Sequence, residues 1–194
     1  ASWTNLATKL ARAHVCTSTF HFSSGSYVDV ASQSALSRHT GGQLYLYHGV
    51  TAESTSTWGA KLSAELHRLL TRPFGYEGVM RVRCSKGLRV DEYMLGAHRY
   101  GDVDVDVPGI DADLAFAATF KHDEGLEERL TPCLQCALLY TTSSGSRRIR
   151  VLTLGLKATS QIASVYRYAD LEAISNVLMR RAVCNAAKST LHAV

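Results

Sequence analysis

The sequence lacks a long apolar segment and has few prolines and aromatic residues. No uninterrupted apolar run approaches the roughly 20 residues that a membrane-spanning helix needs. Only 3 prolines and 8% aromatic residues occur among the 194 residues, and no basic segment followed by an apolar one opens the chain. The N-terminus therefore does not resemble a signal peptide. Any association with a membrane is expected to be peripheral.

The motifs of common catalytic and nucleotide-binding sites are also missing. The sequence contains no GxSxG, GxGxxG or HExxH string and no phosphate-binding loop. Its 8 histidines are scattered, and none forms an obvious set with a cysteine and an acid. We therefore expect a protein that is not an enzyme.

The 5 cysteines are too sparse for a disulfide framework, so a reducing cytosol is the simpler interpretation. Cys133 and Cys136 form a lone CxxC, without a second pair at the spacing of a zinc site. On a strand their thiols would point to opposite faces. We expect small core cysteines and no metal site.

Aspartates between Asp102 and Asp106, followed by Asp113, have part of the spacing of a calcium-binding loop. The position that requires glycine is occupied by Val107, and Pro108 follows it. No helix is predicted on either side of these residues. The preferred interpretation is a strand whose aspartates face water.

What is present is the composition of a globular protein, with 46% hydrophobic and 20% charged residues. The formal net charge of +4 favours an anionic partner, such as acidic lipid, an acidic peptide or nucleic acid. The aromatic residues do not alternate with the basic ones, as stacking platforms for bases would require. Nucleic acid is therefore not expected as a partner, although a basic nucleic-acid-binding module is the alternative from charge alone.

The residue pattern changes twice along the chain. Before Pro73, helical apolar spacing alternates with short β-rich runs, and the clearest helix covers residues 58–70. Residues 78–156 form short alternating segments, the last of which predicts a hairpin with its tip at 142–146. From Ser160 the helical period returns. This order predicts an α+β fold, with ends too short to close a core of their own.

Two basic clusters supply the candidate binding residues. On a strand, Arg81 and Arg83 share one face with their Cα atoms about 6.5–7 Å apart. Such a pair suits two acids at alternate positions of an extended peptide, although a solvated strand face is the commoner meaning of the pattern. Arg147, Arg148 and Arg150 flank the predicted hairpin. They are a candidate contact for an acidic surface, or a charged edge that resists aggregation.

Several strings together resemble one protein family. These strings are YVDVA at 27–31, TGGQ at 40–43, GVMRVRCSKGL at 78–88 and ALLYTTSSGSRRIRVLTL at 137–154. Their order is that of the Sec24 family, the cargo-binding subunits of the COPII vesicle coat. Residues 169–171 resemble the start of the helical domain of that family. The resemblance covers residues from about 6 to 184.

The resemblance implies three parts. Residues 1–73 would be the end of a trunk domain similar to a von Willebrand type A fold, residues 74–158 an antiparallel β-sandwich and residues 159–194 the start of a helical domain. The zinc of the family belongs to a zinc finger outside this sequence, so no cofactor is expected here. The paralogous Sec23 subunit has the same architecture and is the alternative within the family.

The resemblance also implies a function. The family binds sorting signals of cargo and fusion proteins on the cytosolic face of the endoplasmic reticulum, for transport to the Golgi, beside a Sec23-like subunit and an acidic membrane. Its pocket for acidic DxE-type signals uses arginines and a leucine that match Arg81, Arg83 and Leu139 by position. Two further arginines of that pocket lie upstream of this sequence. The segment Leu95–Gly101 departs from the usual family pattern.

Overall fold

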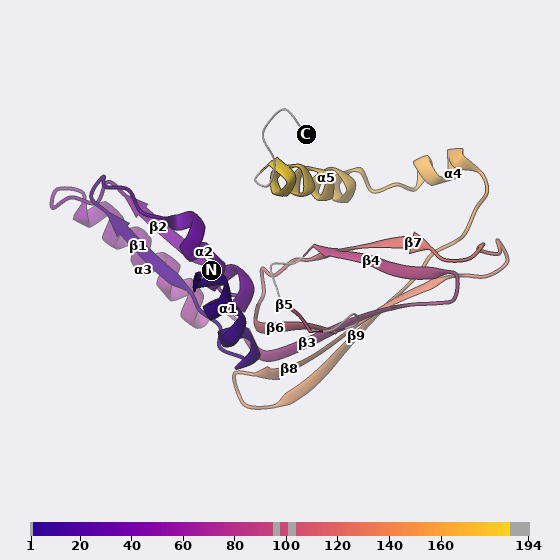
Figure 1. The fold of residues 1–194 in the computed structure, drawn as a ribbon, viewed down its shortest axis with the longest axis horizontal. Coiled ribbons are helices and arrows are strands. Elements are labelled where there is room, and N and C mark those ends of the chain that lie inside the picture. Colours follow the sequence, from indigo (N-terminus) through magenta and orange to yellow (C-terminus); the bar gives the residue numbers. More distant parts are fainter. Residues whose placement is uncertain (1, 95–97, 101–103, 187–194) are drawn as a thin grey trace.

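The structure is a computed structural model that describes residues 2–94, 98–100 and 104–186. Its helices are α1 (Ser2–Arg12), α2 (Val30–Thr40), α3 (Thr55–Thr71), α4 (Ile162–Arg167) and α5 (Leu171–Ala186). Its strands are β1 (Thr19–Ser23), β2 (Leu44–His48), β3 (Phe74–Cys84), β4 (Leu88–Met94), β5 (His98–Tyr100), β6 (Asp104–Asp111), β7 (Ala117–His122), β8 (Cys133–Thr142) and β9 (Arg147–Gly155). The α/β part, the block of strands and the final helices follow one another as predicted, and the fold is α+β (Figure 1). None of the described helices has the length and apolar character needed to cross a membrane.

The N-terminal part is built on β1 and β2, which pair in parallel. The Asp29 carboxylate caps the start of α2, and Gly41 ends this helix in the left-handed conformation with a φ of 78°. Tyr47 of β2 is fully buried. Its ring stacks on Phe22 of β1, and Trp58 of α3 meets it edge-on with 5.9 Å between the centroids. This aromatic contact attaches α3 to the small sheet.

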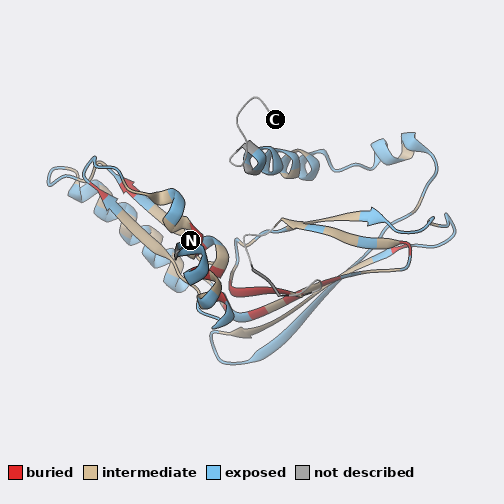
Figure 2. Ribbon diagram, viewed as in Figure 1, coloured by how far each residue is buried: buried red, intermediate tan, exposed pale blue. Residues whose placement is uncertain are grey.

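The middle part is a β-sandwich of two antiparallel sheets. One sheet has the strand order β5-β6-β3-β8-β9, and the other pairs β4 with β7. The core lies on β3 and β6, where Met80, Val105 and Val107 are each at most 2% exposed (Figure 2). Tyr93 of β4 and Leu138 of β8 pack against these side chains. The Met80 face of β3 is therefore the one that the second sheet covers.

The predicted hairpin between β8 and β9 is confirmed. Its tip is a turn in which the Thr142 backbone N–H donates to the Ser146 carbonyl at 2.9 Å, and Gly145 has a φ of 82°. Tip residues 143–146 are exposed, as the polar sequence predicted. β9 is an edge strand of the larger sheet, and all 9 of its residues are exposed.

The N-terminal part meets the sandwich where α3 leads into β3. Arg72 lies between them, and its guanidinium is 2.5 Å from the Asp111 carboxylate and 2.8 Å from that of Asp113. The side chains of Arg72 and Asp111 are only 9% and 6% exposed. The backbones also approach closely, because a Cβ atom at Gly41 would lie 2.3 Å from the Gly109 carbonyl oxygen. The junction is thus a packed contact with a buried ion pair.

The two cysteines of the CxxC string point to opposite faces of β8, as the alternation predicted. Cys136 packs against the core cluster, whereas Cys133 is exposed. The prediction that both are core cysteines is therefore wrong for Cys133. Residues three apart on a strand occupy opposite faces, and the second sheet covers only one of them.

Candidate functional site

Arg81 and Arg83 lie on the same face of β3, as the period of two predicted. The intervening residues point the other way, with Met80 2% and Val82 7% exposed. Arg81 is half-buried and Arg83 is exposed. The two guanidinium groups therefore belong to the outer face of the larger sheet, away from β4 and β7.

Arg81 is engaged by Asp104, which lies directly opposite it on β6. The Arg81 Nε donates to Asp104 Oδ1 at 2.6 Å, and Nη2 donates to Oδ2 at 2.5 Å. This two-point contact is the geometry in which a guanidinium binds a carboxylate best. The hydrogen bond from Arg81 lowers the pKa of Asp104, and the charge of Arg83 acts in the same direction.

The expectation that the aspartates of this segment face water is wrong for Asp106, which is 9% exposed on β6. Asp104 is partly exposed, but its carboxylate is paired with Arg81. The strand itself, preferred over a calcium loop, is confirmed for Asp104–Asp111. Asp102 and residues 95–97 lie outside the described residues. The sequence did not predict that Asp104 is the partner of Arg81, because the register between β3 and β6 joins residues 23 positions apart.

Arg83 lies two residues further along β3, on the same face as Arg81. Within the described ranges it has no side-chain hydrogen bond and no ion pair at 4 Å or less. Its strand neighbour on β8 is Gln135. The outer face of β3 thus presents one arginine that is neutralised by a carboxylate and one whose charge faces solvent.

Leu139 lies on the same outer face as the two arginines. It is paired with Val79 on β3, and Arg81 is paired with Ala137. Leu139 therefore lies two residues along β8 from Ala137, the residue beside Arg81. Its side chain is half-buried. Leu139 therefore lies on the strand next to that of Arg81. Its apolar side chain is close to a charged one on the same face.

The second basic cluster is divided between two faces of β9. Arg147 donates to the Glu77 carbonyl oxygen at 3.0 Å and to the Thr141 hydroxyl at 2.8 Å. Glu77 occupies a bulge of β3 with a positive φ of 52°. Arg148 and Arg150 are exposed and share the opposite face, which is that of Leu138. The three arginines therefore do not form one flat surface.

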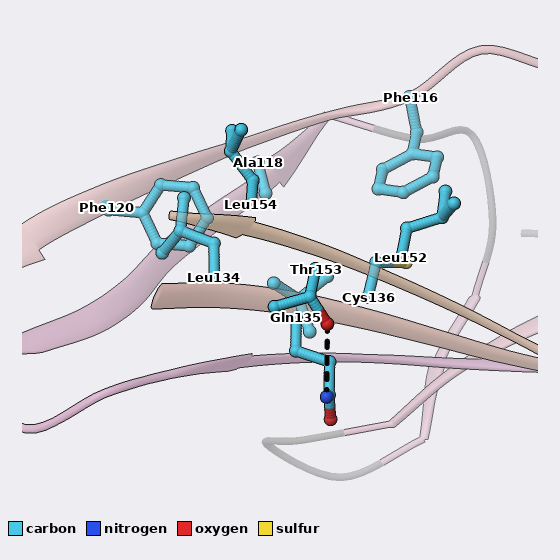
Figure 3. Close-up of a pocket in the computed structure, with 10 residues that line it drawn as sticks. Phe116, Ala118, Phe120, Leu134, Gln135, Cys136, Leu152, Thr153 and Leu154 are labelled. Atoms are coloured by element: carbon cyan, nitrogen blue, oxygen red, sulfur yellow. Dashed lines mark hydrogen bonds between the residues drawn. The ribbon is translucent and has the colours of Figure 1, made fainter. Parts of the chain in front are cut away.

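An apolar pocket that the sequence did not indicate opens between the two sheets. It has a volume of about 260 Å³ and is lined mainly by the apolar side chains of Val82, Phe116, Ala118, Phe120, Leu134, Cys136, Leu152 and Leu154. Figure 3 shows Leu134 and Phe120 on the pocket side of the strands, whereas the Gln135–Thr153 hydrogen bond of 3.4 Å lies on the other side. Leu152 and Leu154 are 60% and 57% exposed there. In the sequence, the alternation of Leu152 and Leu154 on β9 is the signal that could have indicated the pocket side of this strand.

The chain is similar to proteins of known family. The Sec23/Sec24 beta-sandwich domain matches residues 75–159. Protein transport protein SEC24 B of Arabidopsis thaliana is 42% identical over 177 residues, which is 91% of this chain and 16% of that protein. Human protein transport protein Sec24D is 35% identical over 192 residues, or 97% of this chain and 18% of that protein.

A solved structure shows the same arrangement of the chain. The crystal structure of the human COPII-coat protein Sec24c matches 98% of this chain with a TM-score of 0.92 and 32% identity. The match takes up 25% of that structure's chain. Agreement over nearly the whole chain extends the similarity beyond the sandwich to the flanking helices and to β1 and β2. The chain belongs to the Sec23/Sec24 family, on its Sec24 side.

Proposed function

We propose that the chain is the part of a COPII coat subunit that binds acidic sorting signals of cargo proteins. The observation that carries the proposal is the outer face of β3, where Arg81 and Arg83 project to the same side next to Leu139 on β8. The side chains of an extended D-x-E peptide alternate with the same period. Two charge-assisted contacts can then form together, with an apolar wall beside them.

The family supports the rest of this proposal. The relatives are named protein transport proteins, and the human structure is named a COPII-coat protein. The chain would act on the cytosolic face of the endoplasmic reticulum and its vesicles, beside a Sec23-like subunit, as a scaffold without catalytic activity. Residues 1–73 would complete a trunk domain of von Willebrand A type, and residues 159–194 would begin a helical domain. The exposed Arg148 and Arg150 suit a peripheral contact with an acidic membrane surface.

The test reverses the charge of the two arginines in the complete protein that contains this chain. Arg81→Glu together with Arg83→Glu should weaken a D-x-E peptide at least about tenfold, because charge-assisted contacts become repulsions. The matched control is Arg148→Glu with Arg150→Glu, a double reversal at the same spacing on the opposite face of β9. Affinity is measured by fluorescence anisotropy with a labelled peptide. An equal loss of peptide affinity in both variants would show that the effect comes from the net charge of the protein and not from a site at Arg81 and Arg83.

Leu139→Trp tests the apolar wall without changing charge. A larger side chain beside Val79 should fill the space next to Arg81 and block the peptide sterically. The free energy of unfolding should change little, because Leu139 is only half-buried. Undiminished peptide binding by a folded Leu139→Trp variant would remove Leu139 from the site.

A further inference from the structure

We infer that Asp104 is an internal competitor for Arg81. An acidic sorting signal must then either displace the Asp104 carboxylate or bind Arg81 against the repulsion of that carboxylate. This inference rests on the proposed function, because it concerns the same arginine. Asp104 supplies from β6 the same chemical group that the peptide would supply from solution. It is already positioned on the outer face of the sheet.

The geometry of the pair leaves Arg81 partly occupied. Asp104 takes the side of the guanidinium formed by Nε and Nη2, at 2.6 and 2.5 Å. A peptide carboxylate must either replace Asp104 on that side or bind the remaining N–H groups beside a second negative charge. Both routes are opposed by Asp104, the first by competition and the second by like-charge repulsion.

The exposure of the pair permits this exchange. The side chains of Arg81 and Asp104 are 39% and 32% exposed, so the contact is open to solvent and to a ligand. Asp104 is fixed at the backbone by its pairing with Arg81 on β3. Displacement therefore requires only a rotation of the Asp104 side chain, and the sheet stays as it is. An ion pair as exposed as this one contributes little to folding, which keeps exchange accessible.

A second charge helps an acidic peptide to compete with Asp104. Arg83 is exposed two residues from Arg81, and it lies on the same face. A peptide with two acids can contact Arg83 while its other acid competes with Asp104 for Arg81. A peptide with one acid gains only one of these contacts. Arg83 thus holds a signal with two acids while its other acid competes with Asp104, which a signal with one acid cannot do.

The experiment uses the complete protein and a labelled D-x-E peptide, with N-x-Q as the neutral peptide. Asp104→Asn keeps the shape of the side chain and removes its charge, so the affinity for D-x-E should rise about three- to tenfold. The affinity for N-x-Q should not change. Asp104→Ser is a second neutral variant should the first fold poorly.

The matched control is Asp91→Asn. Asp91 lies on β4 and pairs with Lys121 across the strands at 2.8 Å, with 27% of its side chain exposed. It therefore has the same charge, a similar exposure and a cationic partner, but it is absent from the outer face of β3. Asp91→Asn should leave the affinity for D-x-E within about twofold of the wild type, since exposed charges at a distance are screened by salt.

The outcomes separate the inference from the proposed function. If reversal of Arg81 and Arg83 abolishes peptide binding but Asp104→Asn does not strengthen it, the binding site stands and Asp104 is not a competitor. Weaker binding by Asp104→Asn would show that Asp104 positions Arg81 for the peptide. If reversal of the arginines has no effect, both fail. In an Arg81→Gln background, Asp104→Asn should lose most of its effect on D-x-E affinity, because the competition requires Arg81.

Discussion

Gly109 of β6 lies so close to Cys16 that a Cβ atom at position 109 would be 2.4 Å from the Cys16 sulfur. The same atom would lie 2.9 Å from the ring of Phe74 at the start of β3. Residues on three separate segments therefore meet without space for one methyl group. This contact is part of the junction between the N-terminal part and the sandwich.

Gly109→Ala should destabilise the protein, because the added methyl group overlaps Cys16 and Phe74. Overpacking of a tight contact costs about 1–3 kcal/mol of the free energy of unfolding. Gly125→Ala is the control, because a Cβ at Gly125 meets no atom of the described residues within 4 Å. Urea unfolding followed by circular dichroism measures both. Equal stability of the two variants would contradict the close contact.

Cys16 should react slowly with alkylating reagents. Burial, assisted by the charge of Asp111, raises the pKa of the Cys16 thiol to about 11. The neutral thiol is then the dominant form at pH 8, and it is a poor nucleophile. Iodoacetamide at pH 8, followed by mass spectrometry of peptides, should label the exposed Cys133 well before Cys16. Labelling at equal rates in the folded protein would mean that Cys16 is accessible.

Arg72→Ala should be strongly destabilising, because it leaves the Asp111 carboxylate buried, and among the described residues only the Gln43 amide at 3.2 Å remains as a side-chain donor to it. Removal of one partner from a buried ion pair costs about 3–5 kcal/mol of the free energy of unfolding. Arg68→Ala removes an arginine from the same network, but Arg68 is 66% exposed and should matter much less. Comparable losses in the two variants, measured by urea unfolding, would refute the distinction.

The chain studied alone should associate in solution. Within the described residues β9 has an unpaired edge, and it exposes Ile149, Val151, Leu152 and Leu154 by 51–69%. Such an edge pairs readily with another chain. Light scattering coupled to size exclusion should detect species larger than a monomer, and calorimetry should show a broad transition. A monomer with one sharp two-state transition at high temperature would count against this prediction.

The parts of the fold that the sequence predicted depend on local periodicity. The helical spacing of residues 58–70 and the polar tip at 142–146 each determine an element without help from the rest of the chain. The shared face of Arg81 and Arg83 follows in the same way from the period of a strand. Each of these features is set by neighbours in the sequence.

What the sequence did not predict depends on register between distant segments. The partner of Arg81 is set by the pairing of β3 with β6, and the partner of Arg72 by the end of β6 at Asp111. Local patterns do not specify which residue will lie opposite another across a sheet. The aspartates were therefore assigned to solvent, although Asp104 contacts a candidate binding residue.

Recognition of two acids by the charge and spacing of Arg81 and Arg83 is tested most directly by a reciprocal charge exchange. The affinities of a D-x-E and a K-x-K peptide are measured for the wild type and for Arg81→Glu with Arg83→Glu in the complete protein. The wild type should bind D-x-E and not K-x-K, and the variant should reverse this preference, because opposite charges are then restored at the same spacing. A folded variant that still prefers D-x-E would contradict the account.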